Sequence, residues 1–173
     1  MNEIVTRRMI AFAGLLASTL MAACGVRSTN PSPETLTIYQ DAPAMNPLDL
    51  GPPGSSPGDA YYFSAPLHSS RGGPVIGEVF GSKTLIKLAT DVKSNSSEQR
   101  ATLLIFTFGN NRDDQLVVMG VPDYPSNAAE FSAGQPVARA ILGGTGKYMA
   151  VRGQLTSTRN TDGSYTQVFT LVK

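Results

Sequence analysis

The sequence predicts an all-β protein, and in particular an eight-stranded antiparallel β-barrel. Eight or nine short segments alternate apolar and polar side chains with a period of two, which is the pattern of β-strands. Turn-forming residues separate these segments at intervals of about 8 to 12 residues, which suits a sandwich or a barrel. We favour the barrel because closure removes unpaired edges and gives each strand an inner and an outer face. We expect this closed sheet to surround a hollow interior.

The expected strands are joined by loops and turns rich in proline, glycine and asparagine, and the longest loops are residues 41–58 and 121–136. No segment beyond residue 33 shows a helical period. Residues 100–108 show the strongest strand pattern in the chain, and we expect both faces of this strand to be buried because both are apolar. The expected strands are residues 34–40, 59–67, 75–81, 83–90, 100–108, 115–120, 137–142, 147–153 and 165–172.

A glycine cluster, G-G-T-G at 143–146, lies between the strands expected at 137–142 and 147–153. Glycine reaches positive φ without steric cost, so the cluster predicts a tight hairpin connection. A phosphate-binding P-loop is excluded, because Ile141 stands where its first glycine belongs and Tyr148 follows the lysine. A dinucleotide-binding fingerprint is excluded as well, since Met149 replaces its last glycine and no βαβ unit surrounds it.

The first 23 residues resemble an export signal, with Arg7 and Arg8 before an apolar run at 9–20 that is short for a membrane span. The run ends in L-M-A-A-C, which is similar to a bacterial lipobox with Cys24 as the acylated residue. We therefore expect residues 1–23 to be a signal peptide and 24–33 a tether. A barrel domain at 34–173 would then be anchored by lipid to a membrane of the cell envelope after export. Secretion with a free thiol is the alternative.

Composition excludes several classes of function. Cys24 is the only cysteine, so no internal disulfide forms. His68 is the only histidine, and with no cysteine or second histidine beside it we do not expect a transition-metal site. Without the signal peptide the chain has 12 basic and 12 acidic residues and no basic cluster, which argues against a nucleic-acid partner. We expect neither a metal nor another cofactor.

Four segments carry a resemblance to the allene oxide cyclase and dirigent superfamily. They read G-D-A-Y-Y-F-S-A-P-L at 58–67, I-G-E-V-F-G at 76–81, F-T-F-G at 106–109 and L-G-G-T-G-K-Y-M-A-V-R-G at 142–153. Their order and spacing extend over residues 34–173. The resemblance implies a lipocalin-like barrel with an apolar internal pocket, and a homo-oligomer, either a trimer or a dimer. It also implies control of a cyclisation, isomerisation or stereoselective coupling by holding one conformer of the reactant.

The resemblance gives site residues of two kinds. Asp41 after the first strand and Arg152 after the glycine cluster match positions of the dirigent pattern, and Glu78 stands where dirigent proteins usually have a basic residue. We take these three as the candidate catalytic residues. The cyclases' glutamate would lie near Thr37, where no carboxylate is present, and this argues against cyclase activity of the plant type. The candidate ligand-binding residues are aromatic: Tyr39, Tyr61, Phe63, Phe80, Phe106 and Tyr148.

The alternation of the strands leaves the orientation of these charged residues open. Arg152 shares a strand face with Tyr148 and would lie in solvent if the apolar face opposite turned inward. Glu78 shares a face with Ile76 and Phe80, and would be either a carboxylate with a raised pKa against an apolar wall or a solvated outer residue. Asp41 would otherwise cap the start of the proline-rich loop.

Three functions are compatible with these observations. The first is a cyclase, isomerase or stereo-directing protein that binds a hydrophobic small molecule. The second is a carrier of such a ligand without chemistry, as in lipocalins, and the third is a structural module of the envelope. An open cavity with a convergent polar pair would favour the first, and an open apolar cavity the second. A filled interior would favour the third.

Overall fold

The computed structural model describes residues 32–88, 97–126 and 128–173. The described residues belong to one compact unit. The expected signal peptide and Cys24 lie outside the described residues. Within the described ranges, no helix is long and apolar enough to cross a membrane.

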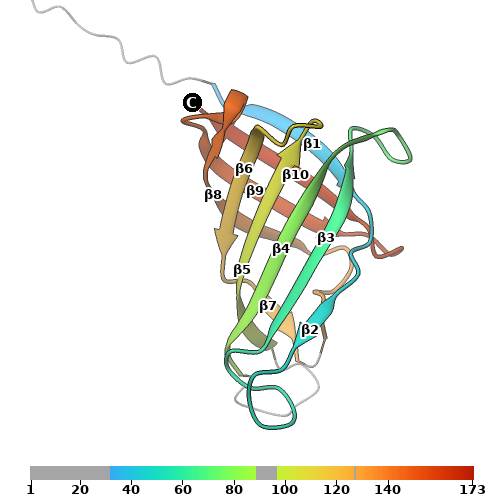
Figure 1. The fold of residues 1–173 in the computed structure, drawn as a ribbon, viewed down its shortest axis with the longest axis vertical. Helices are drawn as coiled ribbons and strands as arrows, with labels where there is room; N and C mark the ends of the chain where they lie inside the picture. The colour runs from blue at the N-terminus through green and yellow to red at the C-terminus, as the bar shows by residue number, and fades with distance from the viewer. Residues whose placement is uncertain (1–31, 89–96, 127) are drawn as a thin grey trace, which may run out of the picture. The chain divides into compact units, whose positions relative to one another are not determined.

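The fold is a closed eight-stranded antiparallel β-barrel, which confirms the fold class predicted from the sequence (Figure 1). Hydrogen-bonded strands follow the order β1-β10-β9-β8-β6-β5-β4-β3, and β1 pairs with β3 to close the ring. The eight strands are β1 (Glu34–Gln40), β3 (Ala60–His68), β4 (Val75–Lys87), β5 (Ser97–Phe108), β6 (Asp114–Gly120), β8 (Pro136–Thr145), β9 (Arg152–Arg159) and β10 (Tyr165–Val172).

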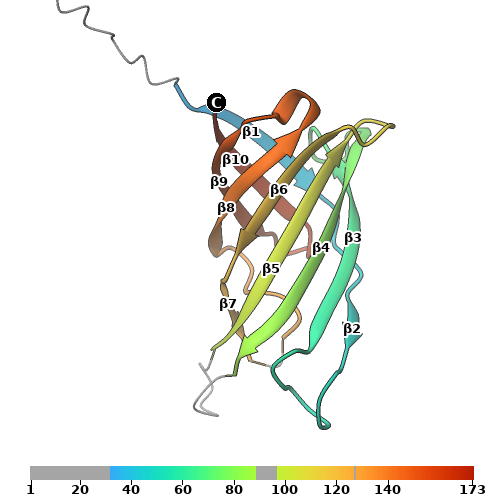
Figure 2. The same cartoon turned by 60° about the vertical axis from the view of Figure 1, so that its left-hand side comes forward.

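Closure depends on a short contact between the first strand and the third. Tyr39 pairs with His68 and Gln40 with Leu67, and the amide of Asp41 donates to the carbonyl of Pro66 at 3.1 Å. Two short strands extend the wall: β2 (Asn46–Leu48) pairs with β3, and β7 (Asp123–Pro125) pairs with the start of β5. Figure 2 shows β3, β4 and β5 as the long strands, with β2 and β7 beside their lower halves.

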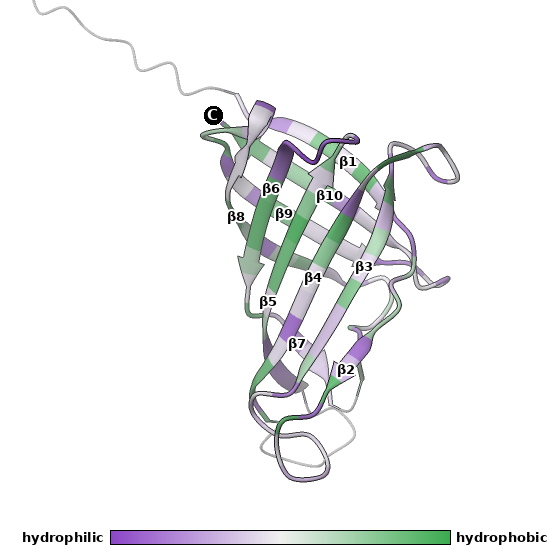
Figure 3. Ribbon diagram, in the orientation of Figure 1, coloured by the Kyte–Doolittle hydropathy of each residue, from purple (hydrophilic) through white to green (hydrophobic). Residues whose placement is uncertain are grey.

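Inward-facing residues at one end of the barrel form the hydrophobic core. Hydrophobic and hydrophilic positions alternate along the strands (Figure 3), as the pleat requires. In β5 the inward set continues from Leu104 to Phe106 and Phe108, and the ring of Phe106 meets that of Phe169 edge to face at 4.9 Å between centroids. The expected burial of both faces of this strand is only partly correct, because Leu103 and Ile105 are half-buried on the outside.

Residues 75–81 and 83–90, expected as two strands, form the single strand β4 up to Lys87. The apparent break at Gly81 has a packing role instead. A Cβ at Gly81 would lie 2.1 Å from the Cζ atom of Phe63 on the neighbouring strand. The absent side chain therefore makes room for the aromatic ring inside the barrel.

The glycine cluster is also placed differently from the prediction. Strand β8 continues through Gly143 and Gly144 to Thr145, and the chain turns in a short 3₁₀ helix, η1 (Gly146–Tyr148), before β9 begins at Arg152. A Cβ at Gly144 would lie 2.2 Å from the carbonyl oxygen of Gln115, so close approach of two strands is the reason for this glycine. The expected strand at 147–153, with Tyr148 and Arg152 on one face, is therefore wrong.

The expectation of a hollow interior is wrong for the described residues. Leu116, Val118, Leu155 and Phe169 are inaccessible to solvent and fill the middle of the barrel. The interior cavity, among polar side chains, has a volume of about 20 Å³, enough for one water molecule. A ligand larger than this enters the interior only if one end of the barrel rearranges.

Candidate functional site: a buried polar cluster at one end of the barrel

The inward faces of several strands change from apolar to polar along their length, and the polar halves meet at the same end of the barrel. Along β5 the inward series begins with Glu98, Arg100 and Thr102 before it becomes apolar at Leu104. All members of the resulting cluster except Glu130 are buried. The cluster comprises Gln40, Lys83, Glu98, Arg100, Thr102, Tyr124, Glu130, Arg139, Ser157, Tyr165 and Gln167.

Two carboxylates in the cluster are paired with cations. Glu98 accepts a hydrogen bond from Arg100, and both side chains are buried. Glu130 accepts from Lys83 at 2.7 Å and from the hydroxyl of Tyr165. Because each charge is removed from water, these pairs are stable only while both partners remain in place.

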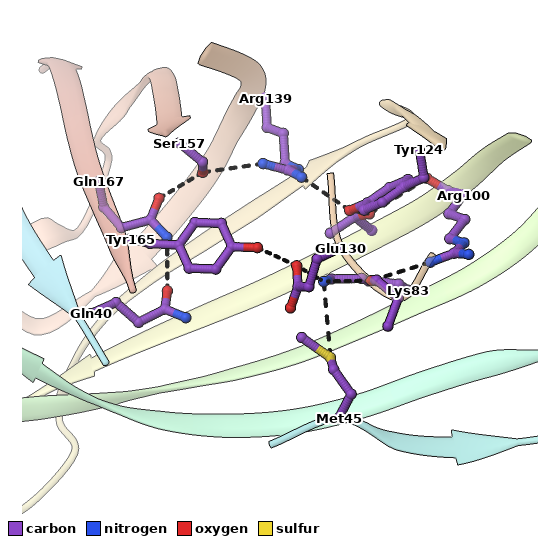
Figure 4. A network of polar contacts seen from close by, with 12 residues as sticks. Gln40, Met45, Lys83, Arg100, Tyr124, Glu130, Arg139, Ser157, Tyr165 and Gln167 are labelled. Carbon is purple, nitrogen blue, oxygen red and sulfur yellow. Dashed lines mark hydrogen bonds and ion pairs between the residues drawn. The ribbon is translucent and has the colours of Figure 1, made fainter. Parts of the chain in front are cut away.

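The third cation, Arg139, lies in a chain of neutral hydrogen-bonding groups. Its guanidinium donates to Ser157 Oγ at 3.1 Å and to the hydroxyl of Tyr124 at 3.2 Å. Ser157 in turn donates to Gln167, and Gln167 to Gln40 at 2.7 Å. Arg139, Ser157, Gln167 and Gln40 lie on the neighbouring strands β8, β9, β10 and β1, and Figure 4 shows their hydrogen bonds running from strand to strand. The small cavity lies between this chain and Lys83.

The segment 128–135, which belongs to the connection between β7 and β8, covers this end of the barrel. It contributes Glu130 and Phe131, and the carbonyl oxygen of Ala129 accepts from Lys83 at 3.3 Å and from Arg100 at 3.2 Å. The ring of Phe131 packs 5.4 Å from that of Tyr165. Part of the expected loop at 121–136 therefore enters the barrel interior, and residues 123–125 of it form β7.

Burial changes the proton affinity of two groups here. Loss of water lowers the pKa of Lys83 to about 8, although the neighbouring Glu130 carboxylate acts in the opposite direction. Burial raises the pKa of Tyr165, and the same carboxylate adds to this effect. Lys83 therefore becomes uncharged, and able to accept a proton, at a lower pH than an exposed lysine, while Tyr165 remains a hydrogen-bond donor.

The three residues expected to be catalytic do not meet in the structure. Glu78 lies on the outer side of β4 and pairs with Arg112 at 3.0 Å. Asp41 is exposed and lies 3.2 Å from Nε2 of His68, whose pKa it raises. Arg152 is exposed at the start of β9 and donates to the carbonyl of Val151 at 2.9 Å. None of them takes part in the hydrogen bonds of the interior cluster.

The six aromatic candidates divide into three pairs. Tyr61 and Phe63 adjoin the polar cluster, with the Arg100 guanidinium 4.9 Å from the first ring and Lys83 Nζ 5.0 Å from the second. Phe106 and Tyr148 belong to the apolar core. Tyr39 and Phe80 are half-buried beneath Arg71 and Arg112, respectively.

The sequence interpretation missed the cluster itself, although a signal for it was present. Glu98, Arg100 and Thr102 have the same two-residue phase as Leu104 and therefore had to share its inward face. Among the described residues, no group of three or more histidine, cysteine, aspartate or glutamate side chains is placed to hold a metal ion.

The geometry defines a closed barrel with a polar end, and comparison with solved structures agrees with the barrel fold. Neither protein-family models nor curated proteins match the sequence. Solved structures do match the fold. A pyocyanin demethylase has a TM-score of 0.61 at 22% identity, over 80% of this chain and 100% of the other.

Two further similar structures are of a Diels-Alderase and of a dirigent protein. The Diels-Alderase AbmU from Streptomyces koyangensis has a TM-score of 0.59 at 15% identity, over 85% of this chain and 70% of its own. A pterocarpan synthase dirigent protein has a TM-score of 0.51 at 16% identity, over 92% of this chain and 99% of its own. The chain therefore has the dirigent-like and cyclase-like barrel fold.

Proposed function

We propose that the barrel binds an apolar or aromatic small molecule at its polar end and directs a cyclisation, an isomerisation or a stereoselective coupling of that molecule. The observation that supports this best is the convergence of Lys83, Arg139 and Tyr165 around a small cavity inside the barrel. Buried polar groups that converge on a cavity are the usual mark of a binding site. The similar barrels include a Diels-Alderase and a dirigent protein.

The chemistry would consist of orientation and proton transfer. The barrel wall would restrict the conformers of the bound molecule, which lowers the entropic part of the barrier. Lys83 in its uncharged form would accept a proton, and the hydroxyl of Tyr165 would donate a hydrogen bond to an oxygen of the reactant. No covalent intermediate is required.

A structural module of the envelope is the second candidate, and the filled interior of the described barrel favours it. The polar cluster argues against this candidate, because burying Arg139 without a carboxylate partner is costly and a purely structural core avoids that cost. A carrier without chemistry would use the same binding site, so the binding experiment below supports either small-molecule function against the structural one.

Titration with N-phenyl-1-naphthylamine, a neutral aromatic molecule that fluoresces in apolar sites, tests the proposal. We expect one saturable site in the mature protein. Ser157→Leu should weaken binding by about tenfold or more, because the leucine fills the cavity beside Arg139. Phe131→Ala should strengthen binding, because it makes room at the same place. Ser64→Leu, on the exposed face of β3, is the matched control.

We also propose that Cys24 carries a lipid that anchors the barrel to a membrane of the cell envelope. The support is the lipobox-like sequence before Cys24, which lies outside the described residues. Cys24→Ser should move the protein from the membrane fraction to the soluble fraction of the cell, with immunoblotting of both fractions as the measurement. A variant that stays with the membrane would contradict lipidation at this site.

A further inference from the structure

Arg139 is a buried cation whose charge no described carboxylate balances. The residue is 4% exposed, and its guanidinium contacts are the hydroxyls of Ser157 and Tyr124 and the ring of Phe131 at 5.7 Å. Its Nε is buried and makes no hydrogen bond with the described residues. The cluster as described holds three cations and two carboxylates, so it carries one positive charge that lacks a partner. A buried charge of this kind favours an anion nearby.

The carboxylate of Glu130 reaches the cluster from the covering segment rather than from the barrel wall. Oε2 accepts from Lys83 and Tyr165, whereas Oε1 is buried without a hydrogen-bond partner among the described residues. The next residue, Phe131, places its ring between those of Tyr124 and Tyr165, at 6.0 and 5.4 Å between centroids. The segment thus presents a carboxylate and an aromatic ring side by side to the interior.

We infer that the polar end of the barrel is a binding site for an aromatic carboxylate, which takes the place of the Glu130 carboxylate and the Phe131 ring. This inference rests on the proposed function and names the class of its ligand. The ring of the ligand would pack between Tyr124 and Tyr165, and its carboxylate would lie between Lys83 and Arg139. Arg139 supplies a planar, permanently charged donor that matches a carboxylate.

The charge balance favours this exchange. When the covering segment withdraws, Glu130 leaves with it, and three cations remain with Glu98 as the described carboxylate of the cluster. Lys83 and Arg100 also lose the carbonyl oxygen of Ala129, which frees two charged donors. An incoming anion replaces these contacts, whereas a neutral ligand of the same shape leaves the cations without a charged partner.

Calorimetric titration with 3-phenylpropanoate and with its neutral amide, 3-phenylpropanamide, tests the inference on the mature protein. The acid should bind about tenfold or more tightly than the amide. Arg139→Met should remove this preference, and Arg112→Met, on the outer surface, should keep it. Glu130→Gln should raise the affinity for the acid above that of the wild type, because the acid then displaces an uncharged group. Circular dichroism of each variant shows that the barrel is folded.

The outcomes separate this inference from the proposed function. Equal affinities for acid and amide, or a preference that survives Arg139→Met, would overturn the inference, and so would an affinity for the acid that falls in Glu130→Gln. If N-phenyl-1-naphthylamine still binds inside the barrel in that case, the proposed function stands. If that neutral probe fails to bind as well, both are wrong.

Discussion

Replacing Glu98 with glutamine should lower the free energy of unfolding by about 3 kcal/mol or more, which is the usual result of removing one partner of a buried ion pair. Glu98 and Arg100 are both about 2% exposed, so water does not replace the lost carboxylate. The guanidinium of Arg100 would keep the carbonyl of Ala129 and the ring of Tyr61 as contacts but would have lost its anion. Urea unfolding followed by circular dichroism measures the effect.

Two further proteins show whether the buried charge is the cause. Glu78→Gln breaks the pair with Arg112 on the outer surface, where the guanidinium side chain is 60% exposed, and should cost less than about 1 kcal/mol. The double variant Glu98→Leu with Arg100→Met removes both charges and should recover most of the loss. Similar losses in Glu98→Gln and Glu78→Gln would contradict the account of the interior pair.

The second large effect is a rise in stability with pH that depends on Lys83. Burial lowers the pKa of Lys83 in the folded protein from 10.5 to about 8, so between these two values the unfolded chain holds a proton that the folded protein does not. The unfolding free energy therefore increases with pH in this window and is unaffected by this group below pH 8, where both states are protonated. The expected gain is about 3 kcal/mol from a shift of this size.

The comparison with Lys83→Met isolates this effect from other titrating groups. The unfolding free energy of the wild type should rise relative to that of the variant between about pH 8 and pH 10.5 and should be parallel to it below this window. Urea titrations at intervals of pH give both curves. Curves that stay parallel throughout would show that Lys83 keeps its ordinary proton affinity in the folded protein.

The sequence was sufficient for the class of fold because the strand signal is local. The alternation at residues 34–40, 100–108 and 165–172 is strong enough to place three strands close to their observed bounds. Closure was also predicted correctly, on the ground that a closed sheet leaves no unpaired edge. Gly81 and Gly144 were misread as breaks, since their reason is contact with Phe63 and with the carbonyl of Gln115, which lie far away in sequence.

The candidate site was harder to predict than the fold. Glu98 precedes the strand expected at 100–108, Arg139 belongs to the strand expected at 137–142, and neither was singled out, because the choice of Arg152 and Glu78 followed the family resemblance. Lys83 and Glu130 are 47 residues apart, and no local pattern indicates that the loop at 121–136 enters the barrel. The two-residue alternation along β5 could have indicated the polar cluster, because it places Arg100 on the same face as Leu104.

The titration with N-phenyl-1-naphthylamine tests the central claim, that the polar end of this barrel is a binding site for a small molecule, most directly. The account predicts a single saturable site whose affinity falls in Ser157→Leu, rises in Phe131→Ala and is unchanged in Ser64→Leu. Absence of saturable binding, or binding that Ser157→Leu leaves unchanged while Ser64→Leu weakens it, would contradict the account.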